Sequence, residues 1–262
     1  MKNISLSHIC FVAFVITSIM GCVAIDTADK TPHVHTAPEP ELERQALKYP
    51  DALYLEGLGE QQRIALTFDD GPGEYTEDLL EVLAKHEVKA TFFWTGEQIK
   101  KHPEVVKAAA ARGHTIGNHT VSHPHSRELN IEQFWSDQVA PTQQLIEATT
   151  GATPALFRPP YGEITDAQIE FLDHQKGMTI IGWSIDPKDW SMSNEPGAPG
   201  AIIQTVQAYA HPEAIVLMHD GIFGYPPNTI QAIDELIPWL KNRGYKFATI
   251  DELLRLSPTL QN

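Results

Sequence analysis

The sequence of 262 residues has only two cysteines, Cys10 and Cys22, and both lie near its N-terminus. Beyond Cys22 the chain can form no internal disulfide and offers no thiolate to a metal ion. Any metal site in that part of the chain must therefore use histidine and carboxylate ligands. The sequence is rich in both, with 12 histidines and 34 aspartates and glutamates.

Positive charge is scarce as well. The 19 lysines and arginines are outnumbered by the acidic residues, and the formal net charge is −15. This balance argues against nucleic acid or an anionic membrane surface as a partner, because both attract basic proteins. A neutral or cationic substrate would suit it. Charge alone does not distinguish such an enzyme from any acidic exported protein.

The apolar run at residues 9–20 is shorter than the roughly 20 residues of a membrane-spanning helix. With Lys2 before it, the run has the pattern of an export signal. The Ile-Met-Gly-Cys sequence at 19–22 resembles the lipobox of bacterial lipoproteins. That resemblance implies removal of residues 1–21 and a membrane lipid anchor on Cys22, in the bacterial cell envelope. The alternative is an ordinary signal peptide with an incidental cysteine.

The length and the 42% hydrophobic composition are enough for one sizeable core, so we expect one main domain with appendages. Residues 23–49 are polar, contain proline and are weakly periodic, which predicts a linker with an average reach of roughly 30 Å. We expect a tether and lead-in at 22–60, the domain at 61–256 and a short tail at 257–262. His33 and His35 are interpreted as solvated linker residues.

From residue 64 onward short β-like runs alternate with amphipathic helical patterns, and seven such pairs can be counted. The predicted strands are 64–68, 89–94, 114–118, 155–158, 178–184, 214–218 and 245–249. Predicted helices include 77–86, 103–113 and 228–244, the last with Asn228 as a candidate N-cap. This rhythm predicts an α/β fold with a parallel sheet, either open or closed into a barrel.

Polar side chains follow five of the predicted strands. They are Asp69 and Asp70, His119 and His123, Arg158, Asp186 and Asp189, and His219. Parallel α/β folds place their functional sites at the carboxyl ends of the strands. We therefore expect these side chains to meet on one rim of the domain.

The first strand ends in IALTFDDGP, residues 64–72, with two adjacent carboxylates. Such neighbours repel each other and tend to acquire a cation, a proton or full solvation. A plain turn is the alternative, because Asp-Gly and Gly-Pro are common turn formers. His119 and His123 are four apart, so on a helical turn they would face one ion together. With one aspartate they would form a set typical of catalytic zinc or another divalent metal.

Five motifs in order carry a resemblance to a known family. TFDDGP (67–72), HTVSHP (119–124), RPPYG (158–162), DPKDW (186–190) and LMH (217–219) are similar to those of the polysaccharide deacetylases, the NodB homology domain of carbohydrate esterase family four. The similarity runs from about residue 64 to 254. It implies a distorted (β/α)7 barrel, which agrees with the seven counted pairs.

The resemblance also implies a role for each matching residue. The metal ligands are Asp70, His119 and His123, holding Zn²⁺ or Co²⁺. The catalytic residues are Asp69 as general base, Arg158 as its orienting partner, His219 as general acid and Asp189 as the acidic partner of His219. The substrate-binding residues are Tyr161, through its backbone N–H, with Trp190 and Leu217 lining the acetyl and sugar pocket.

Some motif residues have plainer interpretations. For Trp190 the alternative to substrate binding is an ordinary place in the hydrophobic core. Asp186 is given no chemical role beyond capping a loop. Further aromatic residues near the strand ends are candidates for stacking on sugar rings, although packing is their more common use. They are Trp94, Trp183, Phe223 and Tyr225.

We thus expect a metal-dependent hydrolase that removes acetyl groups from N-acetylglucosamine units of a polysaccharide, either peptidoglycan or chitin-type oligomers. Two alternatives stay open. One is an O-acetyl esterase acting on xylan-like chains, and the other is a catalytically silent envelope lipoprotein that binds glycans. The intact Asp69, Asp70, His119, His123 and His219 argue against silence. The sequence indicates no oligomeric state.

Overall fold

The computed structural model describes residues 40–221 and 225–260. Residues 1–21, Cys22, both linker histidines and Phe223 lie outside this part. The described chain forms one parallel sheet in the order β1-β6-β5-β4-β3-β2-β7, with β8 paired to β2. The strands are β1 (Leu53–Tyr54), β2 (Arg63–Asp69), β3 (Thr91–Trp94), β4 (Thr115–Asn118), β5 (Leu156–Phe157), β6 (Thr179–Ile181), β7 (Ala214–His219) and β8 (Lys246–Phe247).

The sheet curls so that the chain just after β6 reaches the edge strand β7. Just after β6, Ile185 forms a parallel bridge with Val216 of β7, and the N–H of Leu217 donates to the Ile185 carbonyl at 2.8 Å. All seven predicted strands are present, and the expected distorted (β/α)7 barrel is confirmed. β1 is an eighth strand that the sequence pattern did not predict.

The alternation of side chains along β2 explains how the strand delivers its acids to the rim. Ile64, Leu66 and Phe68 belong to the apolar cluster between the sheet and the helices outside it, which we call the outer core. Ala65 belongs to a second apolar cluster that includes the barrel interior, which we call the inner core. Thr67 accepts a hydrogen bond from Arg158 inside the barrel. Because helices cover one face and the barrel interior fills the other, nearly the whole strand is apolar or buried.

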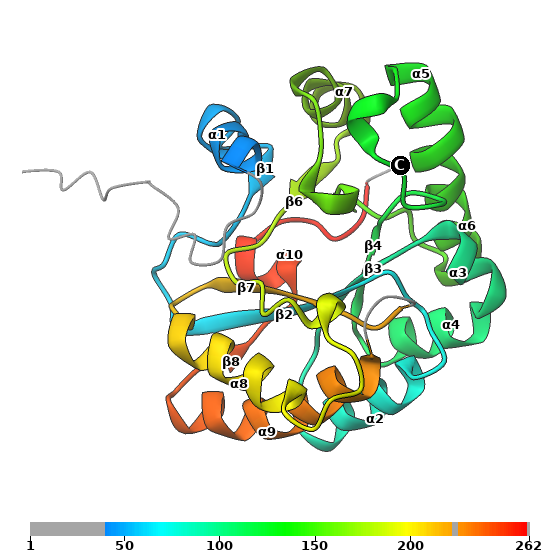
Figure 1. Ribbon diagram of the computed structural model, residues 1–262. Helices are drawn as coiled ribbons and strands as arrows, with labels where there is room; N and C mark the ends of the chain where they lie inside the picture. The colour runs from blue at the N-terminus through cyan, green and yellow to red at the C-terminus, as the bar shows by residue number, and fades with distance from the viewer. Residues whose placement is uncertain (1–39, 222–224, 261–262) are drawn as a thin grey trace, which may run out of the picture. The chain divides into compact units, whose positions relative to one another are not determined.

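Helices surround the curved sheet (Figure 1). Residues of α2, α4, α8 and α9 pack with the outward side chains of β2, β3 and β7. The α-helices are α1 (Pro40–Lys48), α2 (Thr76–Lys85), α3 (Gly96–Lys101), α4 (Pro103–Ala111), α5 (Ile131–Gln133), α6 (Ala140–Thr150), α7 (Asp166–Lys176), α8 (Ala198–Tyr209), α9 (Pro226–Asn242) and α10 (Ile250–Leu254). A π-helical turn, η2 (Phe134–Val139), joins α5 to α6, and η1 (Ser126–Glu128), η3 (Pro160–Gly162) and η4 (Asp189–Ser191) are single 3-10 turns. No helix in residues 40–221 or 225–260 has the length and apolar character needed to cross a membrane.

The predicted linker is wrong for its last residues, because α1 is a docked helix. Leu42 of α1 is fully buried in the inner core. The Gln45 side chain donates to the Ile164 carbonyl at 2.8 Å, and Lys48 pairs with Asp166 at 2.6 Å. The helix contains few apolar residues, so its composition resembles that of the polar segment before it. The folded domain therefore includes residues well before the expected boundary at 61.

Two smaller expectations are also corrected. Asn228 does not cap α9, which begins two residues earlier; its side chain donates to the Ser193 carbonyl at 2.9 Å instead. The expected C-terminal tail is not a free end in its described part. Thr259 bridges to Pro154 next to β5, and the N–H of Leu260 donates to the Thr153 carbonyl at 2.9 Å.

Candidate active site

The two acids at the end of β2 are both 3% exposed and face different partners. Asp69 is the last residue of β2 and points into the barrel, where Arg158 meets it. Asp70 adopts a left-handed backbone with φ of 72°. Its Oδ1 lies 3.4 Å from Nε2 of His119 and 3.3 Å from Nε2 of His123. Adjacent carboxylates thus serve two separate clusters.

Asp70, His119 and His123 form the one group in the described residues whose ligand atoms could hold a metal ion, all within 4.8 Å of one another. The expectation that the two histidines share a helical turn is wrong, since residues 119–125 form a loop. Thr120 and His123 have φ of 66° and 58°. These left-handed residues fold the loop back so that both imidazoles face Asp70.

The donor set fits a divalent cation. Oδ1 of Asp70 is buried and makes no hydrogen bond with any described residue, although it faces two imidazole nitrogens. Nδ1 of His119 donates to the Arg158 carbonyl at 2.7 Å, which fixes the proton on Nδ1 and turns Nε2 towards Asp70. Two neutral imidazoles and one carboxylate are typical ligands of Zn²⁺. These three residues are the ones that would hold the metal.

The charge balance of this cluster also favours a cation. Burial would raise the pKa of Asp70, but the close approach of His119, with charge from His219 and His123, lowers it to about 2. Burial lowers the pKa of His123 to about 4, with charge from His119 acting in the same direction. Asp70 is therefore an anion and His123 a neutral imidazole near neutral pH, as metal ligands must be.

Arg158 follows β5 and is fully buried inside the barrel. Nη1 donates to Oδ1 of Asp69 at 2.8 Å and to the Thr67 hydroxyl at 2.7 Å, and Nη2 donates to the Gly182 carbonyl at 2.8 Å. The guanidinium also lies 4.2 Å from the ring centre of Phe93. Gly117 on the neighbouring strand leaves the space for that ring, because a Cβ there would lie 2.5 Å from it. Arg158 thus fixes one oxygen of Asp69 and leaves the other free.

His219, at the end of β7, is held by Asp189 of η4. Nδ1 of His219 donates to Oδ1 of Asp189 at 2.8 Å, and the His219 backbone N–H donates to Oδ2 at 2.9 Å. Thr229 donates to the same Oδ2 at 2.8 Å. Burial would lower the pKa of His219, but the charge and hydrogen bond of Asp189, with the charges of Asp70 and Asp69, raise it to about 9. Nε2 of His219 lies 3.9 Å from Oδ2 of Asp70.

The residues expected to bind substrate lie in different environments. Tyr161 is 47% exposed and Trp190 is 48% exposed, so the interpretation of Trp190 as core is wrong. The Tyr161 ring packs edge-on against His123, with ring centres 4.5 Å apart. Leu217 is buried at the end of the inner core. Asp186 accepts the N–H of Lys188 at 2.7 Å, as expected for a loop cap.

Comparison with known proteins identifies the family of this chain. Residues 57–181 match the polysaccharide deacetylase family. A peptidoglycan-N-acetylglucosamine deacetylase of Bacillus cereus is 36% identical over 207 residues, which cover 79% of this chain and 73% of that protein. The chain belongs to the polysaccharide deacetylase family.

Other members extend the comparison. A chitooligosaccharide deacetylase of Bradyrhizobium is 34% identical and aligned over 90% of its length and 72% of this chain. A Listeria monocytogenes peptidoglycan-N-acetylglucosamine deacetylase is 38% identical over 73% of this chain, which spans only 39% of that longer protein.

Solved structures give the same family. A peptidoglycan N-acetylglucosamine deacetylase in complex with 4-naphthalen-1-yl-N-oxidanyl-benzamide superposes with a TM-score of 0.77 at 34% identity, covering 82% of this chain and 99% of that one. A pseudoenzyme of carbohydrate esterase family four from Bacillus anthracis superposes with a TM-score of 0.69 at 33% identity, covering 77% and 68% of the two chains. The family thus contains both active enzymes and a silent relative.

In this polysaccharide deacetylase the sequence reasoning missed one buried acid beside the site. Asp220 is 2% exposed, accepts from the Thr76 hydroxyl at 2.6 Å and from the Trp94 indole at 3.2 Å. Burial raises its pKa to about 7, against the lowering effect of those two hydrogen bonds. Its place directly after His219 at a strand end was the available signal. Trp94 is therefore core, as is Trp183, which is 7% exposed.

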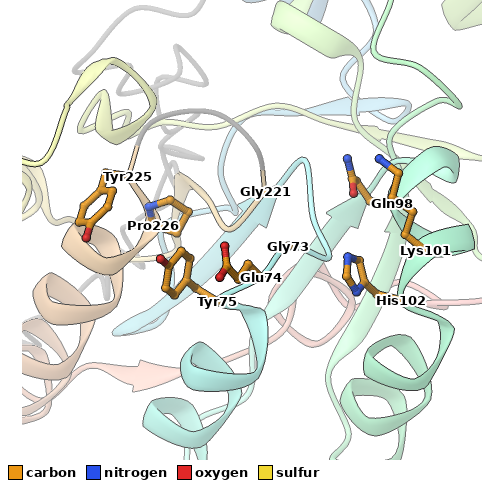
Figure 2. Close-up of a pocket in the computed structure, with 9 residues that line it drawn as sticks. All are labelled: Gly73, Glu74, Tyr75, Gln98, Lys101, His102, Gly221, Tyr225 and Pro226. Atoms are coloured by element: carbon orange, nitrogen blue, oxygen red, sulfur yellow. The ribbon is translucent and has the colours of Figure 1, made fainter.

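A pocket of about 450 Å³ lies beside the rim between the β2–α2 loop, α3 and the start of α9 (Figure 2). Tyr75 and Tyr225 lie on one side, with ring centres 6.4 Å apart, and Lys101 and His102 lie on the other. Gly73 and Gly221 are part of its lining. Gly221 lies directly against the Asp70 backbone, because a Cβ at this position would clash with it. Tyr225, a candidate for sugar stacking, is thus part of a pocket next to the acids.

Proposed function

We propose that the protein is a metal-dependent hydrolase that removes N-acetyl groups from N-acetylglucosamine units of peptidoglycan, with chitin-type oligomers as the second substrate class. One observation carries the proposal: a carboxylate and an imidazole approach the Asp70, His119 and His123 set at different members of it, Asp69 at His119 and His219 at Asp70. Asp69 is held by Arg158 on one side, and His219 is held by Asp189 on the other. Family membership and the named activities of the relatives support the choice of an amide bond.

Zn²⁺ is the metal we propose, with Co²⁺ as an alternative, because two imidazoles and a carboxylate suit both ions. Bound there, a divalent ion supplies polarisation of the amide carbonyl and lowers the pKa of a coordinated water. The protein contributes the geometry. Asp70 meets both imidazoles from a single oxygen, and His119 is locked in one tautomer by the Arg158 carbonyl.

Asp69 is proposed as the general base. Its Oδ1 is occupied by Arg158, while Oδ2 lies 3.8 Å from Nε2 of His119, on the side of the ligand cluster. The proton taken from the attacking water is held at Oδ2. Tyr161 is proposed to stabilise the oxyanion through its backbone N–H, because it matches the oxyanion donor implied by the RPPYG motif and lies in η3 with its ring against His123.

His219 is proposed as the general acid. Its Nδ1 is engaged by Asp189, so the proton on Nε2 is the one directed towards the ligand cluster. The charge and hydrogen bond of Asp189 raise the pKa of His219, which favours a proton on that nitrogen. Departure of an amine from the tetrahedral intermediate requires this proton, because an amide nitrogen is a poor anionic leaving group. Trp190 and Leu217 are proposed to contact the sugar and acetyl groups.

Acetate release from peptidoglycan, chitin oligomers and acetylxylan, measured side by side with added Zn²⁺ or Co²⁺, tests this function. We expect metal-dependent release from the first two substrates. Release from acetylxylan alone would support the O-acetyl esterase alternative. Saturable glycan binding without any acetate release at full metal occupancy would make the protein a silent member of the family.

We also propose that the enzyme acts outside the cytoplasm and is held at a membrane by lipid on Cys22. The support is the short apolar run followed by Gly21 and Cys22, together with relatives named for a cell-wall polymer. A lipid anchor with several acyl chains gives stable attachment. The substrate would then lie within reach of a tethered domain.

A further inference from the structure

The loop that bears His119 and His123 needs support from outside itself. The loop is not helical. Thr120 and His123 have left-handed backbones, although neither is a glycine. Such conformations persist only where the surrounding structure holds them in place. Inside the loop, one bond contributes: the N–H of His123 donates to the Thr120 hydroxyl at 3.1 Å. The remaining support comes from neighbouring elements.

One neighbour is the long helical segment of α5, η2 and α6, which contains the π-helical turn. Phe134 and Val139 are both fully buried although they are five residues apart. That spacing matches the wider π turn, whereas an α-helix buries residues three or four apart. π turns are rare and often lie at functional sites. Here the turn places Gln138 beside the buried Val139, facing the loop.

Gln138 holds the middle of the loop by its side-chain amide. Its Oε1 accepts the backbone N–H of Val121 at 3.1 Å and that of Ser122 at 3.2 Å. Its Nε2 donates to the Ser122 hydroxyl at 3.2 Å. One side chain therefore binds two consecutive amides between the metal-ligand candidates.

The same π turn anchors the residue just before the loop. The side chain of Asn118, fully buried, donates to the Val139 carbonyl at 2.9 Å and accepts the N–H of Thr120 at 2.9 Å. On the opposite side, the N–H groups of Gly96 and Glu97 donate to the Thr120 and Val121 carbonyls. Among these contacts with the loop, those of Gln138 come from one side chain on an element distant in sequence. A single substitution can therefore remove them.

We propose that Gln138 is a positioning residue for the metal site: its amide fixes the loop so that His119 and His123 present their Nε2 atoms to one cation. This inference rests on the proposed metal-dependent function and deepens it. Hydrogen-bonding partners behind metal ligands typically change metal affinity 10–100-fold when they are removed. Gln138 acts on two ligands at once, because the bonded amides lie between them.

The test is Zn²⁺ affinity by chelator competition in Gln138→Met, Gln138→Glu and the matched control Gln144→Met. Gln144 is exposed on α6, so its change controls for the loss of a helix-surface amide. We expect roughly 10–100-fold weaker binding in Gln138→Met and an altered Co²⁺ absorption spectrum. Gln138→Glu retains an acceptor for both amides and should recover most of the affinity. The control should match the wild type.

Wild-type affinity in Gln138→Met would overturn the inference, as would equal weakening in Gln138→Glu. If Gln138→Met does not fold, Gln138→Asn is measured in the same way, since it is polar but one methylene too short to reach the loop. A wild-type protein that binds no Zn²⁺ or Co²⁺ would instead refute the proposed function. The two failures are therefore distinguishable.

Discussion

Replacing Arg158 with methionine should reveal how the barrel keeps a charged Asp69 in its interior. Arg158 is fully buried and Asp69 is 3% exposed, so each relies on the other for charge compensation. The substitution removes the 2.8 Å bond to Asp69 and leaves that carboxylate buried without its cation. It also removes the donors to the Thr67 hydroxyl and the Gly182 carbonyl.

The expected cost is about 3–5 kcal/mol of unfolding free energy, the usual effect of breaking a buried ion pair by removing one partner. Most of this is the penalty of an uncompensated charge. Neutralising that charge by Asp69→Asn in the same protein should therefore recover about 1–3 kcal/mol. The double variant should be more stable than Arg158→Met alone, although it has one more substitution.

Urea unfolding of the metal-free wild type, both single variants and the double variant measures this cycle. All four proteins are compared at one pH near neutrality, with the slope of the transition checked for constancy. A cost below about 1 kcal/mol for Arg158→Met would refute the reasoning. So would a double variant that is less stable than Arg158→Met, because it would mean that the charge of Asp69 is not what the arginine compensates.

Three further outcomes are expected. His219→Ala should reduce hydrolysis of N-acetylglucosamine oligomers about 10²–10⁴-fold but affect nitrophenyl acetate far less, since nitrophenolate leaves without a proton; equal losses at full metal occupancy would contradict a proton-donor role. His114 is buried and accepts the Ala90 N–H, and burial lowers its pKa to about 4. The unfolded chain therefore binds a proton below about pH 6.5 that the folded chain does not, and stability should fall by up to about 3 kcal/mol from pH 6.5 to pH 4. Urea unfolding should show a shallower fall in His114→Gln, and an unchanged one would count against this. Mass spectrometry of the mature N-terminus should find acyl groups on Cys22, absent in Cys22→Ser; a mature chain that starts elsewhere without lipid would contradict the anchor.

The repeating part of the fold was predictable from sequence because it depends on local patterns. The buried strand of residues 64–68 and the helix opened by Pro103 carry their own hydrophobic periodicity and punctuation. Helix α1 was missed because its stability comes from contacts that are distant in sequence. Leu42 lies beside Gly162 and Gly182, while Gln45 and Lys48 bond to Ile164 and Asp166, all more than 100 residues away in the sequence.

The residues of the candidate site could be predicted from sequence, but the contacts that hold them in place could not. Strand ends bring Asp69, Asp70, His119, Arg158 and His219 to one rim, and that follows from parallel topology. The path of the loop between His119 and His123 could not be predicted in this way. Their four-residue spacing favours a helical turn, whereas contacts distant in sequence select the left-handed backbone at Thr120 and His123. Gln138 was missed because a glutamine within a helix has no distinctive pattern. Asp220 was missed although its place directly after His219 at the end of β7 was a usable signal.

The central claim is that adjacent acids have different work, with Asp70 holding the metal and Asp69 taking the proton. The most direct measurement is metal content per protein after dialysis, together with acetate release from peptidoglycan, in Asp69→Asn and Asp70→Ala. The account predicts that Asp69→Asn keeps about one Zn²⁺ per chain and loses activity, whereas Asp70→Ala loses both. An Asp69→Asn protein without metal beside an Asp70→Ala protein that retains it would contradict the account.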